Sequence, residues 1–436
     1  MHVRPIVASQ DVSRRDFLNI GLTTAAILSV FPGRILASQA GDQINFGANY
    51  KVVPVGNRQR PIVMIWLEGG MSHFDTFSPV PTAPDTIRGP YSTISTTAPG
   101  VRISEKLPLT ARHMNKVALM RNIKHGDHNH STATSLMFSG NSRTSGNNKS
   151  EIDSFTVRLG RYLGESRVGY TTFNSDLNNP YLNPGIGQSD SLYVKQTAQD
   201  ETILRALNSG NTPYPSPFGE GFDRARFRGR NSLLSQLDSG PRTPQTSRWD
   251  TIRERAGSIL DGDLNGSFDL SGVPPRERDK YGRTSFGNAG LITKRMIEAG
   301  APFVLINKYG WDNHSRIREE LDTSLPALDK VLSSLLEDIG DRAIVVVSTE
   351  FGRTPMNTNA GRDHWPHSNF LFIGGAGITG RKYGELDNRG HVTGPDGIFP
   401  GELMGPTIAK AAGYEFVEER AGVLTTNKLP YLPIFN

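Results

Sequence analysis

Short apolar runs recur along this chain, and in its last third they alternate with helical patterns. The runs at 61–68, 302–307 and 343–349 are almost wholly apolar, as strands buried on both faces are. Between them, the segments 285–299 and 315–339 place apolar residues at intervals of three and four, the spacing of amphipathic helices. This alternation predicts an α/β protein, a three-layer α/β/α sandwich with a mainly parallel central sheet.

Weaker patterns extend this assignment over the rest of the chain. Further strands are expected at 116–121, 168–174 and 369–374, and further helices at 105–115, 153–164 and 404–413. Residues 41–60 are predicted to be a polar lead-in, and residues 420–436 to be mostly coil. The stretch 175–250 is rich in Pro, Gly, Asn and Ser, which indicates an irregular insertion with helices near 199–208 and 231–238. Residues 248–262 are also expected to be helical. We therefore expect one domain spanning 41–436.

Residues 1–40 have the pattern of an export signal rather than of folded structure. The pair Arg14-Arg15 stands before Phe17 and an apolar run at 20–31, and small residues follow. This resembles a twin-arginine signal; the alternative is a chance arginine pair before a core helix. The run is too short to span a bilayer stably. The pattern predicts export by the twin-arginine translocase to the periplasm or another extracytoplasmic compartment, with no stable transmembrane segment.

Composition limits the chemistry that is available to the chain. The net charge is +5 over 436 residues, with no lysine-rich block, so nucleic acid is not an expected partner. Cysteine is absent, which excludes disulfides, thiolate metal sites and cysteine nucleophiles. Any metal ion must be bound by His, Asp, Glu or neutral oxygen ligands.

Seven of the ten histidines lie in four short loops, each of which follows a predicted strand and carries an acidic residue. The loops contain His73 and Asp75; His125, Asp127, His128 and His130; Asp312 and His314; and Glu350, Asp363, His364 and His367. Ligands bind beyond the carboxyl ends of the strands in open α/β sheets. The pattern therefore predicts a site for one or two divalent ions, with zinc, manganese, iron or magnesium fitting mixed imidazole and carboxylate ligands better than calcium.

Several of these residues also have a purely structural interpretation. His73 could cap a turn, and only one of His125, His128 and His130 is expected to be functional, with His130 favoured. Glu350 and Arg353 could form an ion pair at a strand end, or Arg353 could bind an anionic substrate through its planar guanidinium.

Four motifs in order resemble one known family. EGGMSHFDTFSP, GWDNH, TEFGRTP and GRDHWPH, behind SRRDFL, are similar to the exported bacterial proteins of domain-of-unknown-function family 1501, over roughly residues 55–415. The resemblance implies an alkaline phosphatase/sulfatase-like fold with a centre of one or two metal ions. It also implies that residues 129–140 are similar to the nucleophile helix of that superfamily, with His130 at the nucleophile position and Ser131 beside it.

The same resemblance suggests roles for the remaining candidates. Asp312 and His314 look like a metal-binding pair, and His364 or His367 looks like the last histidine ligand. Glu350 stands where the superfamily usually has an Asp-His pair, and Glu68 or Asp75 would replace the Asp that ends the first strand.

Together these features predict a metal-dependent hydrolase that acts on phosphate or sulfate esters of small molecules or glycans. The expected ligands are Asp312, His314, Asp363, His364 and His367, with Glu350 and Asp75 as ligands or bases. Arg353 would hold the anion, and His130 or Ser131 would act as nucleophile or leaving-group acid. The alternatives are a non-catalytic binding protein with a degenerate metal site, and a lyase or transferase such as a phosphomutase.

Overall fold

The computed structural model of the chain divides into two units, residues 1–42 and 43–436. The residues that the structure describes all lie in the second unit: 50–140, 154–163, 171–174, 194–196, 229, 232–233, 267 and 270–432 without 395. Several expected elements lie outside these residues: the signal at 1–40 and the helices at 199–208 and 248–262. Of the helix expected at 231–238, only residues 232–233 are described.

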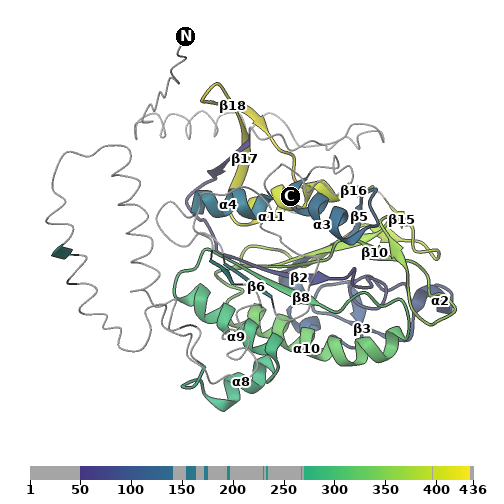
Figure 1. The fold of residues 1–436 in the computed structure, drawn as a ribbon. Coiled ribbons are helices and arrows are strands. Elements are labelled where there is room, and N and C mark those ends of the chain that lie inside the picture. Colours follow the sequence, from purple (N-terminus) through teal and green to yellow (C-terminus); the bar gives the residue numbers. More distant parts are fainter. Residues whose placement is uncertain are drawn as a thin grey trace, which may run out of the picture. The chain divides into compact units, whose positions relative to one another are not determined.

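A mixed sheet of nine strands organises the described part of the chain (Figure 1). Its spatial order is β13 (Arg381–Tyr383), β5 (Val117–Lys124), β12 (Asn369–Gly375), β9 (Ile344–Ser348), β2 (Ile62–Glu68), β8 (Phe303–Tyr309), β6 (Thr171–Asn174) and β7 (Val194–Gln196), with β16 (Phe399–Pro400) also paired to β5. The central strand β2 is apolar up to its last residue and buried along its whole length, as expected for a strand covered on both faces.

Strand direction determines which loops meet at one edge of the sheet. The strands β9, β2, β8, β6 and β7 run parallel to one another, whereas β12 is antiparallel to both β9 and β5. The residues that follow β2, β5, β8 and β9 therefore lie at the same edge as the residues that precede β12.

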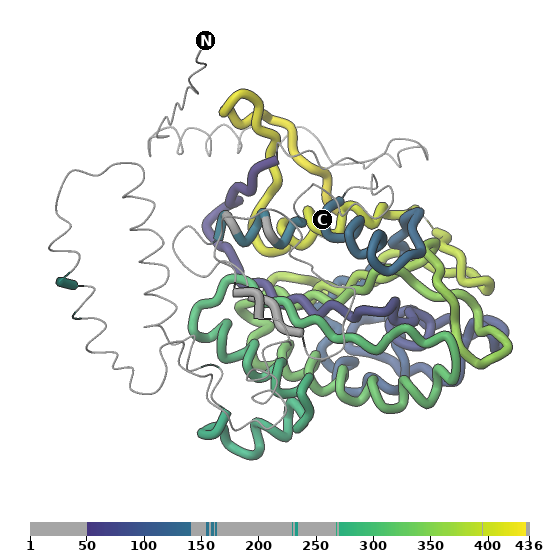
Figure 2. The backbone as a smooth tube through the Cα atoms, viewed as in Figure 1, coloured from purple at the N-terminus to yellow at the C-terminus, as the bar shows by residue number. Residues whose placement is uncertain are grey.

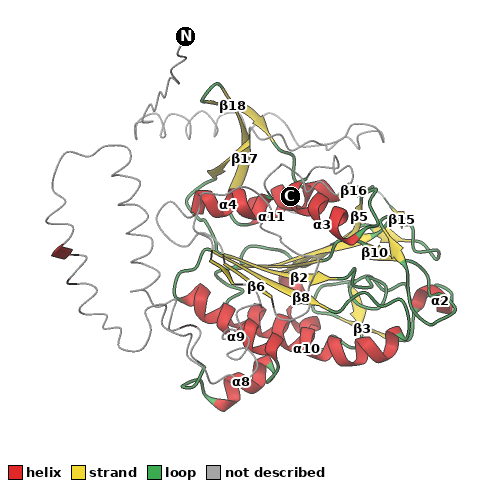
Figure 3. Cartoon of the chain, in the orientation of Figure 1, coloured by secondary structure: helices red, strands yellow, loops and turns green. Residues whose placement is uncertain are grey.

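Helices cover both faces of the sheet and complete the three layers (Figure 3). On one face lie α8 (Pro275–Tyr281), α9 (Ser285–Glu298) and α10 (Ile317–Asp338); on the other lie α3 (His130–Ser139), α4 (Phe155–Leu163) and α11 (Met404–Ala411). The predicted α/β/α sandwich with a mainly parallel sheet is confirmed.

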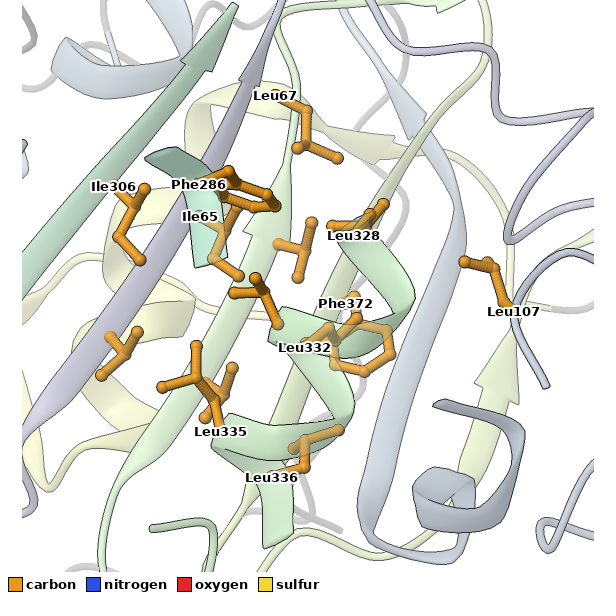
Figure 4. Close-up of a cluster of buried hydrophobic side chains, with 14 of the residues drawn as sticks. Ile65, Leu67, Leu107, Phe286, Ile306, Leu328, Leu332, Leu335, Leu336 and Phe372 are labelled. Atoms are coloured by element: carbon orange, nitrogen blue, oxygen red, sulfur yellow. The ribbon is translucent and has the colours of Figure 1, made fainter. Parts of the chain in front are cut away.

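Two hydrophobic cores, one on each side of the sheet, join these layers. In the larger one, leucines of α10 pack against the sheet residues Ile65 and Ile306, which come from β2 and β8 (Figure 4). Leu328 and Leu332 are fully buried, and each contributes roughly 2 kcal/mol through burial of apolar surface.

Some local expectations are wrong, and long-range pairing explains the difference. The expected lead-in contains β1 (Tyr50–Pro54), and the expected coil contains β18 (Val423–Lys428); both pair antiparallel with β17 (Tyr414–Arg420). Figure 2 shows the purple β1 beside the yellow end of the chain. The helix expected at 105–115 is the 3-10 helix η1 (Thr110–Lys116).

Short elements occupy the loops around this framework. They are α2 (Asp85–Arg88), η3 (Gly401–Leu403) and the antiparallel pairs β3 (Thr93–Ser95) with β4 (Arg102–Ser104), β10 (Gly352–Arg353) with β11 (His364–Trp365), and β14 (Glu385–Leu386) with β15 (Val392–Thr393).

Candidate metal centre

Four candidate residues from three loops converge at the edge of the sheet defined above. His130 is the first residue of α3, which follows β5, and Asp312 and His314 follow β8. His364 belongs to β11, which precedes β12. The antiparallel pairing of Arg353 with His364 fixes this last segment against the residues that follow β9.

A carboxylate oxygen and two imidazole nitrogens form the centre of this cluster. Asp312 Oδ1 lies 2.9 Å from His314 Nε2 and 3.1 Å from His364 Nε2, and the two nitrogens are 3.0 Å apart. His130 Nε2 lies 3.3 Å from the other carboxylate oxygen, Asp312 Oδ2. Ligand atoms of His130, Asp312 and His364 all fall within 4.8 Å of one another.

The Nδ1 atoms of the three histidines all lie close to oxygen acceptors. His130 Nδ1 is 2.7 Å from Glu350 Oε1, His314 Nδ1 is 2.8 Å from Asp363 Oδ1, and His364 Nδ1 is 2.7 Å from the His128 carbonyl oxygen. Because these oxygens only accept hydrogen bonds, each Nδ1 carries a proton and donates it. With Nδ1 held in this way, the Nε2 atom of each ring points toward the cluster, which is how histidine ligands of metal ions are commonly oriented.

This arrangement fits a divalent cation by both spacing and chemistry. An ion bound at about 2.1 Å to ligands at right angles places neighbouring ligand atoms about 3.0 Å apart, close to the three observed separations. Lone pairs of two imidazoles and a carboxylate repel one another unless a positive charge lies among them. The atoms of Asp312, His314 and His364 are therefore suitable ligands for one ion, with His130 beside them.

Glu350 supports His130 and does not reach the cluster as a ligand. Its side chain is fully buried, and Oε1 accepts hydrogen bonds from the Gly69 backbone N–H at 2.8 Å and from His130. The other oxygen, Oε2, lies 2.9 Å from the Thr349 hydroxyl. Both oxygens of Glu350 therefore contact protein groups in this structure, and its expected role as ligand or base stays a prediction.

Electrostatics reflect the close packing of charges around Asp312. Burial alone would raise the pKa of Asp312, but hydrogen bonds from His130, His364 and Arg353 outweigh it and hold the pKa far below its usual range. Burial alone would lower the pKa of His130, but its contacts with Asp312 and Glu350 raise that pKa to about 9.

Arg353 organises the loops and does not face solvent. Its side chain is 1% exposed, and Nη2 donates to Asp312 Oδ1 at 2.6 Å. Nε donates to the Gly70 carbonyl at 2.5 Å, Nη1 to the Arg362 carbonyl at 2.8 Å, and Nη2 also to the Gly69 carbonyl. The expected contact of Arg353 with a substrate anion is not compatible with this burial.

The glycine pair after β2 allows the turn at the end of this strand to pack closely against the loops that carry Asp312 and Arg353. Gly69 and Gly70 have φ values of 114° and 72°, in the region that favours glycine. A Cβ on Gly69 would lie 2.6 Å from the Asp312 backbone nitrogen, and one on Gly70 would lie 2.4 Å from the Phe351 ring. The turn therefore brings the end of β2 against the loops that carry Asp312 and Arg353.

Three other candidates lie away from the cluster. Asp75 is fully buried and forms a two-pronged ion pair with Arg362, at 2.7 and 3.1 Å. His367 is exposed, and its ring contact is with Trp365. Ser131 is exposed on α3. The structure does not bring Asp75 or His367 into the cluster: Asp75 is paired with Arg362, and His367 is exposed beside Trp365. Their ligand roles stay predictions.

Asp363 and His73 contribute through other residues. Asp363 contacts the Nδ1 side of His314 and so orients a ligand without joining the cluster. His73 is buried, and its Nδ1 accepts the Arg353 backbone N–H at 3.3 Å. Burial, and then the charges of Arg362 and Arg121, lower its pKa.

Sequence reasoning missed Arg362, Phe351 and Asn129. Arg362 neutralises Asp75, and the Phe351 ring lies under His364 and His130, with centroids 4.4 and 5.1 Å apart. Asn129 caps α3 by accepting from the N–H groups of Ser131 and Thr132. The helix-cap preference of Asn was the available signal for the last of these, whereas nothing local indicated the other two.

Fold and site together define an α/β protein with a His/Asp cluster that fits a divalent ion at the carboxyl ends of its sheet. The family described as "Protein of unknown function (DUF1501)" matches residues 59–419, and the chain belongs to this family. No curated protein matches the sequence. No helix within the described ranges is both long and apolar enough to cross a membrane.

The solved structures that the chain matches are distant in sequence. A protein in the alkaline phosphatase superfamily from Vibrio parahaemolyticus is 12% identical, with a TM-score of 0.39 over 85% of this chain and 72% of that chain. The C-terminal periplasmic domain of EcEptC from Escherichia coli, in complex with Zn, is 8% identical, with a TM-score of 0.39 over 84% and 85%. Alkaline phosphatase from the Antarctic bacterium TAB5 is 9% identical, with a TM-score of 0.36 over 82% and 99%.

Proposed function

We propose that this protein is an exported, metal-dependent hydrolase of phosphate or sulfate esters. The observation that supports it most directly is the convergence of three Nε2 atoms on the Asp312 carboxylate, each ring being held by an acceptor at Nδ1. Such a site would hold an ion and leave room for a substrate beside it, as hydrolytic metal centres do.

Asp312, His314 and His364 would hold the ion. Bound there, a divalent ion supplies Lewis acidity, which polarises an ester oxygen and stabilises negative charge that develops on it. Imidazole-rich ligation with one carboxylate favours zinc, with iron or manganese next, over magnesium. One ion is expected, because Glu350 and Asp75, the other buried carboxylates considered for the site, are engaged by His130 and Arg362.

The remaining residues bind, orient and exchange protons. His130 would act directly on the substrate as nucleophile or proton donor, with Glu350 fixing its ring. Asp363 and the His128 carbonyl orient the two ligand histidines. Arg353 holds Asp312 in place and neutralises part of its charge.

Export is part of the same proposal. The Arg14-Arg15 pair and the apolar run after it support recognition by the twin-arginine translocase, with the mature protein in the periplasm. The translocase carries folded proteins, which suits a site assembled from loops far apart in the sequence.

A direct test combines metal analysis with an activity panel. The purified full chain, loaded with zinc, manganese or magnesium in turn, is assayed on p-nitrophenyl phosphate, bis-p-nitrophenyl phosphate and p-nitrophenyl sulfate. We expect hydrolysis of at least one ester, lost on chelation and in the His364→Ala variant. The matched control is His391→Ala, at an exposed histidine outside the cluster. Absence of a bound transition metal, with melting unchanged by chelation, would contradict the proposal.

One observation favours a second candidate, a non-catalytic binding protein that keeps the fold. The guanidinium of Arg353, the expected anion holder, is buried among protein acceptors. This candidate predicts that Asp312→Ala and His364→Ala leave both the fold and partner binding intact.

A further inference from the structure

We propose that His125, a buried histidine outside the metal cluster, is a positioning residue that sets the place of Glu350 and, through it, of the His130 ring. The inference deepens the proposed hydrolase function and rests on it, because that function assigns His130 to act on the substrate. It follows from the way in which one loop, residues 125–130, contacts Glu350 at both its backbone and its side chain.

The ring of His125 has a partner at each nitrogen. Nε2 lies 2.6 Å from the Glu350 carbonyl oxygen, and Nδ1 lies 3.2 Å from the Asp127 backbone nitrogen. A carbonyl oxygen only accepts hydrogen bonds and a backbone N–H only donates them, so Nε2 carries the ring proton and Nδ1 carries the lone pair. Burial lowers the pKa of His125, in keeping with this neutral form. The ring is therefore a directional donor to Glu350.

The surroundings of His125 limit the movement of its ring. The residue is 5% exposed, and a Cβ added to Gly401 would lie only 3.1 Å from the ring atom Cδ2. The His125 backbone N–H donates to the Pro366 carbonyl oxygen at 3.1 Å, which ties the start of the loop to the segment that carries His364. The Nε2 donor is thus held at a defined place beside Glu350.

The same loop holds Glu350 at two points. The carbonyl oxygen of Glu350 accepts from His125, and its Oε1 accepts from His130 Nδ1 at 2.7 Å. Because Glu350 is fully buried, water does not readily replace either donor. Without the His125 donor, the backbone at Glu350 would shift toward another donor. The carboxylate would move with it, and so would the His130 ring, whose Nε2 now lies 3.3 Å from Asp312 Oδ2.

Two substitutions separate this contact from the turn that His125 makes with Asp127. Glutamine places an amide NH₂ near the position of the histidine Nε2, so His125→Gln can still donate to Glu350 and loses the acceptor for the Asp127 N–H. Asparagine places an amide oxygen near the position of Nδ1, so His125→Asn keeps that acceptor and loses the donor. The matched control is His113→Asn, at a half-buried histidine of η1 outside the cluster.

The first readout is proton NMR of the full chain in the presence of zinc, where a ring N–H bonded to a buried carboxylate gives a resonance far downfield. The His130 Nδ1 resonance is identified by its absence from His130→Ala. We expect it to persist in His125→Gln and in His113→Asn. In His125→Asn it should be lost or strongly shifted, because the carboxylate that accepts this proton has moved.

The second readout is steady-state kinetics on the best ester of the panel, together with chelator competition for the metal ion. We expect kcat to fall roughly 5- to 30-fold in His125→Asn, the effect of one lost hydrogen bond to a buried acceptor, and to stay within a few-fold in the other two variants. The metal dissociation constant should stay within a few-fold in all three, because His125 acts on His130 and not on the ligand set.

The other outcomes separate this inference from the proposed function. A resonance and a kcat in His125→Asn that match those of His125→Gln would overturn the positioning role. Failure of either variant to fold would also overturn it, since the contact would then be purely structural, and so would the absence of any His130-dependent resonance from the unsubstituted chain. If no ester is hydrolysed with any metal while the resonance follows the expected pattern, the hydrolase proposal fails and the placement of His130 by His125 stands.

Discussion

Replacing Glu350 with glutamine tests whether this residue supports His130 or binds the ion itself. Glu350 is fully buried, and its Oε1 accepts two hydrogen bonds. Glutamine has nearly the same shape and can keep its carbonyl toward both donors, so the change removes charge and little else. It turns a charge-assisted hydrogen bond to His130 into a neutral one.

The size of the effect follows from the two kinds of hydrogen bond. Bonds to charged groups contribute about 1.5 to 3 kcal/mol and neutral ones about 0.5 to 1.5, so the change weakens the support of His130 by about 1 to 2 kcal/mol. Applied to the reaction barrier, this is roughly a 5- to 30-fold loss of kcat/KM. Metal affinity should stay within a few-fold, because Glu350 does not touch Asp312, His314 or His364 in the described contacts.

Two measurements test this prediction. Chelator competition gives the metal dissociation constant of both proteins, and steady-state kinetics on the best ester of the panel gives kcat/KM. A roughly 10- to 100-fold loss of metal affinity would show that Glu350 acts on the ion or on its ligands, and would refute the geometric assignment. Glu350→Ala is the stronger perturbation; it leaves the N–H groups of Gly69 and His130 without this acceptor, and should cost about 2 to 6 kcal/mol of unfolding free energy.

Two further predictions concern the framework that holds the site. Gly70→Ala should lower the free energy of unfolding in urea by at least about 3 kcal/mol, because the new Cβ would lie 2.4 Å from the Phe351 ring. The control Gly100→Ala, with a similar φ but open space around it, should cost about 1 kcal/mol. Equal losses in the two variants would contradict the packing argument. Asp75→Ala should lower the free energy of unfolding by about 3 to 5 kcal/mol, because it leaves the buried Arg362 without its partner carboxylate. The control Arg283→Met removes an exposed ion pair and should leave the urea midpoint unchanged. A loss near zero at Asp75 would show that the buried pair contributes no net stability.

The local pattern predicted the regular elements well where burial alone decides them. The strands at 61–68 and 343–349 and the helix at 315–339 appear within a few residues of their expected ends, since a strand or helix packed on a sheet needs an apolar pattern of its own period. The β1–β17 pairing was missed because it joins segments more than 350 residues apart, and neither strand has a strong alternating pattern.

At the candidate site, too, the local pattern predicted part of the arrangement and long-range contacts decided the rest. The clustering of His and Asp after strands predicted the convergence of His130, Asp312, His314 and His364, because parallel strands bring their carboxyl ends to one edge. It did not predict that Glu350 binds His130, or that Arg353 is buried. Both features depend on which side chain lies within hydrogen-bonding distance of each carboxylate. That is set by small differences in distance between loops far apart in the sequence.

By itself, then, the sequence determined the layered α/β architecture, the absence of thiol chemistry and the set of residues from which a metal centre could be built. Periodicity and residue type carry that information locally. The tertiary structure decided the role of each residue. It determined that Nε2 of each histidine faces the cluster, that Arg362 pairs with Asp75 and His130 with Glu350, and that His367 is exposed to solvent. These depend on the three-dimensional position of each polar group's partner, and no short stretch of chain contains both.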